Sequence, residues 1–246
     1  MAKRVGLVLT GCGRLDGSDV AEVMLTLLVI ERAGAVAVCA APDVDQPAVV
    51  DHATGERTRG TRNARVEAAR LAGTSILPLG ELGPDVVDAL IIPGGAGPVA
   101  TLSDYMDKHE LCQVHPALVG LLRGMLKEHR PMGFVGLSAV LAARVLGPVA
   151  GVRVTVGSKA IPAAKHAAVM GADVRPCAAE DVIVDQKARV YTTPGFLSEG
   201  ARLAGVARAI DRLVRGVVAN AKDRAPRDAA PDALPVETTG PSRGSA

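Results

Sequence analysis

The chain has 246 residues, enough for one α/β domain with a large core or for two small domains. Hydrophobic residues make up 48% of the sequence, charged residues 22%, and the formal net charge is only +2. This small charge, together with an aromatic content of 2% and the absence of tryptophan, argues against a nucleic-acid or anionic-membrane partner. The core must therefore be built from aliphatic side chains.

Cysteine and histidine spacing gives no indication of a metal site or cofactor. The four cysteines form no C-x-x-C pair, and the five histidines lack metal-ligand spacing. The chain start leads directly into about six apolar residues, too few for the core of a signal peptide. No apolar run approaches the roughly 20 residues that span a bilayer. These features predict a reduced, cytoplasmic protein with no membrane partner, no metal and no cofactor.

The chain opens with the pattern of a βαβ unit. A continuous apolar run over 5–9 predicts a parallel strand buried on both faces. A helix is expected over 19–33, and Asp19 with Glu22 three residues later resembles a capping box. A second strand is predicted over 36–41.

The remainder continues this alternation after an irregular loop over 42–61. Further strands are expected over 76–79, 88–92, 131–135 and 152–156, and a hairpin that pairs 182–184 with 190–192. Further helices are expected over 63–72, 116–129, 139–146, 163–170 and 200–218. The alternation predicts an open, mostly parallel sheet with helices on both faces, in a single domain over residues 1–220. Residues 221–246, rich in proline and alanine, are expected to form a disordered tail.

Three predicted strand ends carry distinctive residues: Gly11-Cys12-Gly13, Gly94-Gly95 and Gly136. In such a sheet, ligands bind beyond the carboxyl ends of the strands. Gly136 lies where a strand turns sharply into a helix, which is the geometry of a nucleophile elbow. Glycine tolerates the strained conformation of that turn but supplies no nucleophile.

Each candidate residue also has a structural interpretation. Gly94 and Gly95 could direct N–H groups at a developing oxyanion, or they could form only a tight turn with positive φ. Glu22 could be a partly buried carboxylate suited to proton transfer, although the residues alone favour a capping role. The Cys12 thiol could lie at the mouth of the pocket.

Several segments of the chain share their motifs with one group of proteins. They are Thr10-Gly11-Cys12-Gly13, His52-Ala53-Thr54-Gly55-Glu56, Ile92-Pro93-Gly94-Gly95, Pro131-Met132-Gly133-Phe134 and Thr192-Thr193-Pro194. Over about residues 3–219 the chain resembles the PfpI/ThiJ superfamily, also called class I glutamine amidotransferase-like. Within it, the chain is most similar to the ElbB-like branch of glyoxalase-like proteins associated with isoprenoid biosynthesis.

The resemblance implies a flavodoxin-like three-layer sandwich, usually a homodimer. It also implies a site with an elbow cysteine, a glutamate that hydrogen-bonds it, and glycine amides as oxyanion donors. By position, Glu22 matches the glutamate, Gly94 and Gly95 match the oxyanion loop, and Gly136 matches the missing cysteine. Leu137 stands where many superfamily proteases and amidotransferases carry histidine, and we assign it to the substrate-binding part of the site.

Three interpretations of function remain open at this point. The protein could be a silent or impaired relative whose pocket binds a small carbonyl or carboxylate ligand, as a binding or regulatory module. It could retain activity through Glu22 as a base, with Gly94 and Gly95 polarising the carbonyl. Alternatively, Cys12 or Ser138 could replace the nucleophile, although Ser138 has no visible base. Without the elbow thiol, a 2-oxoaldehyde cannot form the covalent hemithioacetal. We therefore predict a glyoxalase-type pocket with weak or no covalent chemistry.

Overall fold

The computed structural model of the chain describes residues 2–73 and 75–222, and its centre is a seven-stranded sheet. In spatial order the strands are Leu77–Pro78 (β3), Val36–Ala41 (β2), Arg4–Val8 (β1), Ala89–Ile92 (β4), Met132–Val135 (β5), Val190–Thr193 (β9) and Ile183–Asp185 (β8). All neighbours pair in parallel except β8 and β9, which form the predicted antiparallel hairpin. A small separate sheet pairs Arg153–Val154 (β6) with Asp173–Val174 (β7). The predicted mostly parallel sheet is confirmed.

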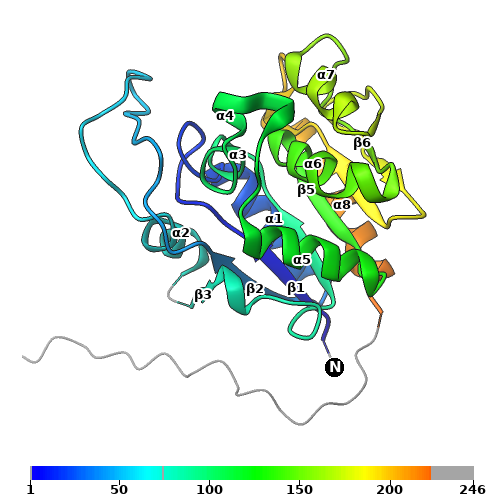
Figure 1. Cartoon of the computed structure of the whole chain (residues 1–246). Helices are drawn as coiled ribbons and strands as arrows, with labels where there is room; N and C mark the ends of the chain where they lie inside the picture. The colour runs from blue at the N-terminus through cyan, green and yellow to red at the C-terminus, as the bar shows by residue number, and fades with distance from the viewer. Residues whose placement is uncertain (1, 74, 223–246) are drawn as a thin grey trace, which may run out of the picture.

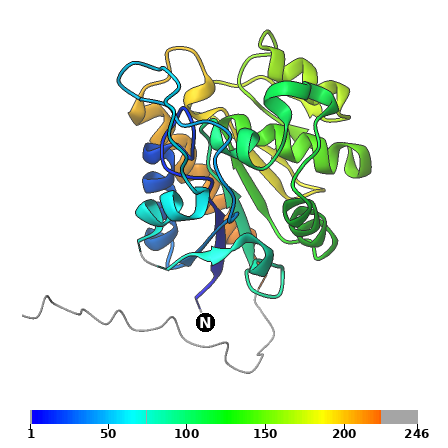
Figure 2. The ribbon, with the colours of Figure 1, turned by 60° about the vertical axis from the view of Figure 1, so that its left-hand side comes forward.

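Helices cover both faces of this sheet, so the architecture is the predicted three-layer α/β sandwich (Figures 1 and 2). One face carries Val20–Arg32 (α1), Ala64–Ala72 (α2) and Leu203–Asn220 (α8). The other face carries Gly97–Thr101 (α3), Tyr105–Lys108 (α4), Pro116–Lys127 (α5) and Ala139–Ala150 (α6), with Pro162–Val169 (α7) packed outside α6. Each face has its own buried aliphatic cluster, as the composition requires.

Burial explains why the central strands could be predicted from the sequence. Every residue of β4 and β5 is buried, because helices cover both faces of the sheet at these positions. The first helix begins where expected, since the Asp19 side chain accepts from the Glu22 N–H at 3.1 Å. It ends at Arg32, and Gly34 follows shortly after with a φ of +69°, a conformation that residues other than glycine rarely adopt.

The structure differs from the predictions in short elements. Helices α3 and α4, with five and four residues, are too short to show an apolar period and were not predicted. The strand expected over 152–156 pairs over two residues only, because it joins the small sheet rather than the central one. The tail predicted to be disordered falls, from residue 223 onward, outside the described residues.

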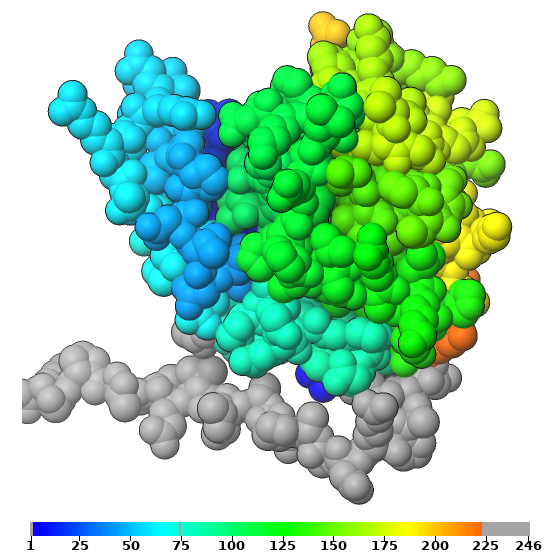
Figure 3. Space-filling model, in the orientation of Figure 1, coloured from blue at the N-terminus to red at the C-terminus, as the bar shows by residue number. Residues whose placement is uncertain are grey.

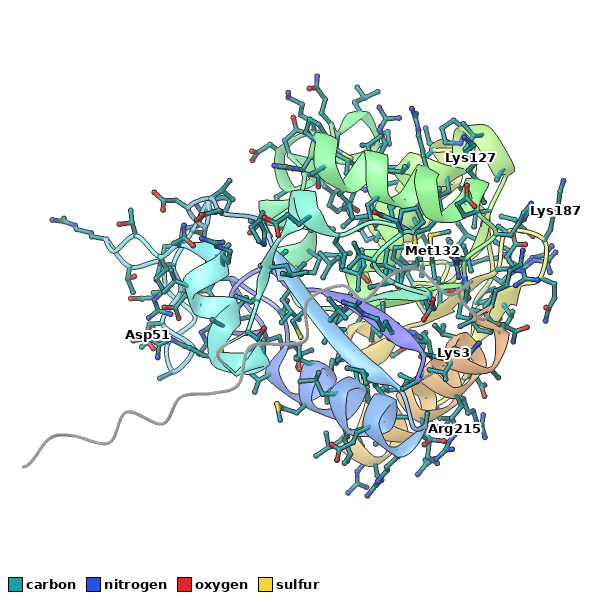
Figure 4. The ribbon with its side chains drawn as sticks, turned by 90° about the horizontal axis from the view of Figure 1, so that it is seen from below. Lys3, Asp51, Lys127, Met132, Lys187 and Arg215 are labelled. Atoms are coloured by element: carbon teal, nitrogen blue, oxygen red, sulfur yellow. The ribbon has the colours of Figure 1, made fainter. Side chains whose placement is uncertain are left out.

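The loop over 42–62 contains only isolated bridges and projects from the body beside α2 (Figure 3). Figure 4 views the amino ends of the strands, where Lys3 and Met132 mark the starts of β1 and β5 and Asp51 marks the projecting loop. Within the described part of the chain, none of the helices combines the length and apolar character needed to cross a bilayer.

Candidate functional site

A cavity of about 340 Å³ lies at the carboxyl ends of four central strands, the end opposite to that seen in Figure 4. Its wall comes from the segments that follow β1, β4, β5 and β9 and from the start of α1. The lining residues are Arg14, Leu15, Asp19, Glu22, Gly95, Ala96, Gly136, Leu137, Phe196 and Leu197. The structure therefore brings together Glu22, Gly95, Gly136 and Leu137 from the sequence-based candidates.

Gly136 forms the elbow between β5 and α6. Its φ is +60°, in the left-handed region, and it opens a short 3₁₀ turn over Gly136–Ser138. A Cβ atom built on Gly136 would have the Pro194 carbonyl oxygen as its nearest neighbour, at 3.4 Å. This is ordinary contact, so the wall has room for a side chain at the position that the family resemblance matches to a cysteine.

Ser138, one of the two suggested replacement nucleophiles, is buried within the elbow rather than exposed to the cavity. Its Oγ accepts from the Val135 N–H at 3.0 Å and lies 2.8 Å from the carbonyl oxygens of Ile92 and Val135. The hydroxyl can donate to only one of these carbonyls at a time. Its contacts fix the turn to β4, which is a structural role.

Glu22 is buried, and backbone amides occupy both of its carboxyl oxygens. The Gly94 N–H donates to Oε2 at 2.8 Å, and the Phe196 N–H donates to Oε1 at 2.9 Å. In a capping box, the glutamate side chain would accept from the Asp19 N–H. Here the Asp19 N–H donates to the Gly94 carbonyl at 2.9 Å, so the capping-box interpretation of the Glu22 side chain is wrong.

The environment of Glu22 raises its pKa from 4.5 to about 7. Burial is the largest cause, because it disfavours the charged form, and the nearby Asp19 carboxylate adds to it. The Phe196 and Gly94 amides and the Arg14 guanidinium act in the opposite direction. Glu22 is thus divided between its acid and base forms near neutral pH.

Three glycines allow the backbone to approach this region closely. A Cβ on Gly94 would collide with Glu22 Oε2, and a Cβ on Gly195 would collide with Glu22 Oε1. Gly95 has φ +99°, and a Cβ there would collide with the Gly17 carbonyl oxygen. The positive φ of Gly95 agrees with the tight-turn interpretation of the pair, whereas the oxyanion interpretation needs a correction at Gly94. The Gly94 N–H is engaged by Glu22 and not free for an oxyanion, while Gly95 is the member that lines the cavity.

Cys12 does not line the cavity, so its predicted place at the pocket mouth is wrong. The thiol is partly buried, and burial raises its pKa, with the charge of Glu67 on α2 as the next cause. A thiol with a raised pKa is a weak nucleophile at neutral pH. The backbone of Cys12 instead forms an isolated β-bridge with Ser18, which closes the loop that follows β1.

Sequence reasoning did not predict five residues of the wall, which are Arg14, Leu15, Ala96, Phe196 and Leu197. Two of them, Arg14 and Phe196, contact each other. The Arg14 Nη2 donates to the Phe196 carbonyl at 2.9 Å, and the guanidinium lies 5.2 Å from the centre of the Phe196 ring. Arg14 Nε is also 3.9 Å from Asp19 Oδ2. Both residues follow the end of a strand, and this position was the signal that could have marked them as site residues. The sequence does not show, however, that β9 pairs with β5 and so brings Phe196 to the cavity.

Within residues 2–73 and 75–222, no group of three or more histidine, cysteine, aspartate or glutamate side chains could hold a metal ion. Arg14, Asp19 and Glu22 are the ionisable residues of the wall in this described part of the chain. The arrangement can hold a small polar molecule and can give or take a proton at Glu22.

The sheet, the strand–turn–helix elbow and the buried glutamate beside it define the ThiJ/PfpI class of α/β proteins. A crystal structure of an isoprenoid biosynthesis protein with an amidotransferase-like domain from Ehrlichia chaffeensis superposes with a TM-score of 0.80 and 26% identity, covering 88% of this chain and 99% of that one. Drosophila melanogaster DJ-1beta, at 17% identity, shares the fold with a TM-score of 0.54, over 89% of this chain and 92% of its own.

Curated relatives give the family. The chain is 36% identical over 226 residues to the human mitochondrial glutamine amidotransferase-like class 1 domain-containing protein 3, covering 88% of this chain and 83% of that protein. It is 36% identical over 205 residues to the mitochondrial ES1 protein homolog of Rattus norvegicus, covering 80% of this chain and 76% of that protein. No protein-family profile matches. The chain belongs to the class I glutamine amidotransferase-like, or PfpI/ThiJ, superfamily.

These relatives correct one prediction. Both carry mitochondrial names, which contradicts the cytoplasmic location expected from the short apolar start of the chain. The length of an apolar run bears on secretory signals alone, whereas mitochondrial addresses are amphipathic and rich in arginine, so it was insufficient to place the protein in the cytoplasm.

Proposed function

We propose that the cavity beside Gly136 is a glyoxalase-type pocket for small carbonyl compounds, which binds its ligand with weak turnover or none. The composition of the wall carries this proposal. Apart from Arg14, Asp19 and Glu22, its described residues are glycine, alanine, leucine and phenylalanine. A thiol, hydroxyl or imidazole that could attack a carbonyl carbon is missing from this described wall.

Residual activity would depend on Glu22. A general acid or base is most effective when its pKa lies near the working pH, and the pKa of Glu22 is about 7. Glu22 could therefore move a proton on a bound carbonyl compound even where no covalent adduct forms. Proton transfer by Glu22 would give the pocket a weak lyase activity, and Glu22 is therefore the residue to test.

The test is consumption of glyoxal and methylglyoxal by wild type, Gly136→Cys, Glu22→Gln and Cys12→Ala. We expect little turnover by wild type, a clear gain in Gly136→Cys, and no change in Cys12→Ala because its thiol lies outside the cavity. Strong wild-type turnover would overturn the proposal. If Cys12→Ala then abolished that turnover, the thiol would be a true replacement nucleophile.

A non-catalytic binding or regulatory module is the second candidate function, favoured by the same lack of a nucleophile in the described wall. It predicts that a small carbonyl or carboxylate compound raises the melting temperature and is recovered unchanged. Recovery of the added compound by NMR separates this outcome from slow turnover.

The homodimer implied by the family resemblance is also a proposal for this chain. Helix α1 exposes an apolar row of Val20, Met24 and Leu28, spaced four residues apart on one face. Light scattering on wild type and Met24→Lys would test it, with Val66→Lys on α2 as a matched change of another exposed apolar residue. A monomeric wild type would reject the dimer.

A further inference from the structure

We propose that Arg14 determines the specificity of the Gly136 cavity and selects small 2-oxo acids, whose carboxylate it binds, over neutral carbonyl compounds. The inference rests on the proposed function and deepens it by naming a substrate class. Among the described residues of the wall, Arg14 supplies the positive charge and the fork of N–H donors that matches a carboxylate.

Most of the donors of Arg14 remain for a ligand. A guanidinium has five N–H groups, and one of them donates to the Phe196 carbonyl at 2.9 Å. The Nε contact to Asp19 Oδ2, at 3.9 Å, is an ion pair too long for a hydrogen bond. The Arg14 side chain is 55% exposed, whereas the Asp19 side chain is 7% exposed. An entering anion therefore meets the guanidinium before the carboxylate.

The side chain of Arg14 is held in place before any ligand arrives. Its guanidinium packs over the Phe196 ring at 5.2 Å, which restricts an otherwise flexible chain. Its backbone carbonyl accepts from the Ala96 N–H at 2.8 Å, so Arg14 is tied to another segment of the wall. Ordering that is already present is not lost again on binding, which favours affinity.

The loop that carries Arg14 is itself anchored from the projecting loop. Asp16, two residues on, accepts from the Val50 N–H at 2.8 Å, and its carbonyl accepts from Gln46 Nε2 at 2.6 Å. The Leu15 N–H donates to His52 Nε2 at 3.2 Å. These contacts make Arg14 part of a fixed wall rather than of a free surface loop.

The other charges of the wall permit an anion beside Arg14. Asp19 accepts from the Glu22 N–H at 3.1 Å and lies at the amino end of α1, where the helix dipole favours negative charge. Glu22 is buried, and its two oxygens accept from backbone amides, which leaves the N–H donors of Arg14 to a ligand. Arg14 thus keeps attraction for a third carboxylate.

The experiment is an NMR titration with two matched probes, pyruvate and hydroxyacetone, which share a ketone and differ in the carboxylate. The proteins are wild type, Arg14→Met, Arg14→Lys and Arg70→Met, the last changing an exposed arginine of α2 outside the cavity. We expect Arg14→Met to weaken pyruvate binding at least tenfold and to leave hydroxyacetone within about twofold. Arg14→Lys should be intermediate because it keeps the charge without the fork, and Arg70→Met should match wild type.

Each other outcome is decisive. Equal weakening of both probes in Arg14→Met would show a packing role and overturn the inference. Equal wild-type affinity for pyruvate and hydroxyacetone would overturn it while leaving the carbonyl pocket intact. Failure of wild type to bind either probe would count against both the inference and the proposed function. Should Arg14→Met not fold, the wild-type ratio and Arg14→Lys still decide.

Discussion

The Phe196 N–H donates to Glu22 Oε1 at 2.9 Å, although the two residues are 174 positions apart in the sequence. The other oxygen of the same carboxyl group accepts from the Gly94 N–H. One side chain of α1 thereby links the segments that follow β4 and β9, on either side of the elbow at Gly136. Glu22 has this structural role whether or not the cavity supports chemistry.

The stability of the protein should depend on pH through Glu22. Its pKa is about 7 in the folded protein and 4.5 ordinarily, so the fold retains a proton that the unfolded chain has released. The resulting stabilisation is complete below about pH 4.5 and is lost as the pH rises through about 7. Its size is about 3 kcal/mol.

Urea unfolding at about pH 5 and about pH 8 measures this contribution. Wild type should lose more stability between these values than Glu22→Gln, by about 2.5 kcal/mol, since part of the contribution is already lost at about pH 5. Glu31→Gln changes an exposed glutamate on the same helix and should keep the wild-type difference. Identical pH profiles for wild type and Glu22→Gln would contradict the assignment.

Gly195 should be intolerant of a side chain because of Glu22. Its φ is +55°, and a Cβ atom would collide with Glu22 Oε1 and approach Val135 Cγ1 to 2.8 Å. We expect Gly195→Ala to lower the free energy of unfolding by about 3 kcal/mol or more, from backbone strain and collision together.

Gly34→Ala is the matched control for this change. Gly34 has φ +69°, and no atom lies within 4 Å of the position that a Cβ would take, so this variant reports backbone strain alone. Its cost should be about 1 kcal/mol. Equal costs for the two alanine variants in urea unfolding would show that the close approach to Glu22 does not matter.

The elbow should accept a side chain at a moderate cost. Gly136 also has a positive φ, of +60°, but the nearest atom to its Cβ position is 3.4 Å away. Gly136→Ala and Gly136→Cys should each cost about 1–2 kcal/mol, close to Gly34→Ala. Both variants should remain folded by circular dichroism, which makes the activity of Gly136→Cys interpretable. A cost as large as that of Gly195→Ala would show that the wall is closed.

The central strands and the main helices could be predicted because their patterns are local. The runs that form β4 and β5 are apolar throughout, and β1 is apolar after Arg4, since both faces of the sheet are covered. The long amphipathic helix α8 shows the same correspondence between sequence and burial. Short elements such as α4 carry too few residues to define a period.

The glycines of the site could be predicted because each follows the end of a strand. Gly95 and Gly136 follow strands that the sequence marks clearly, and both line the cavity. The partners of Glu22 could not be foreseen, because its capping-box spacing gives a simple local explanation and Phe196 arrives through the pairing of β9 with β5. Cys12 shows the converse error, since a strand-end position does not determine on which side a thiol lies.

Ser138 should contribute to stability and not to chemistry. Its Oγ satisfies the buried Val135 N–H at 3.0 Å and lies 2.8 Å from the Ile92 carbonyl, so Ser138→Ala leaves buried backbone groups without a partner. The expected loss in urea unfolding is about 1–3 kcal/mol. Ser158→Ala removes an exposed serine that accepts from the Ala160 N–H and should change stability by less than about 0.5 kcal/mol.

In the Gly136→Cys background, added Ser138→Ala should leave the rate of glyoxal consumption within about threefold once the fraction of folded protein is taken into account. Complete loss of turnover in a folded protein that carries both Gly136→Cys and Ser138→Ala would instead make Ser138 a participant in the reaction.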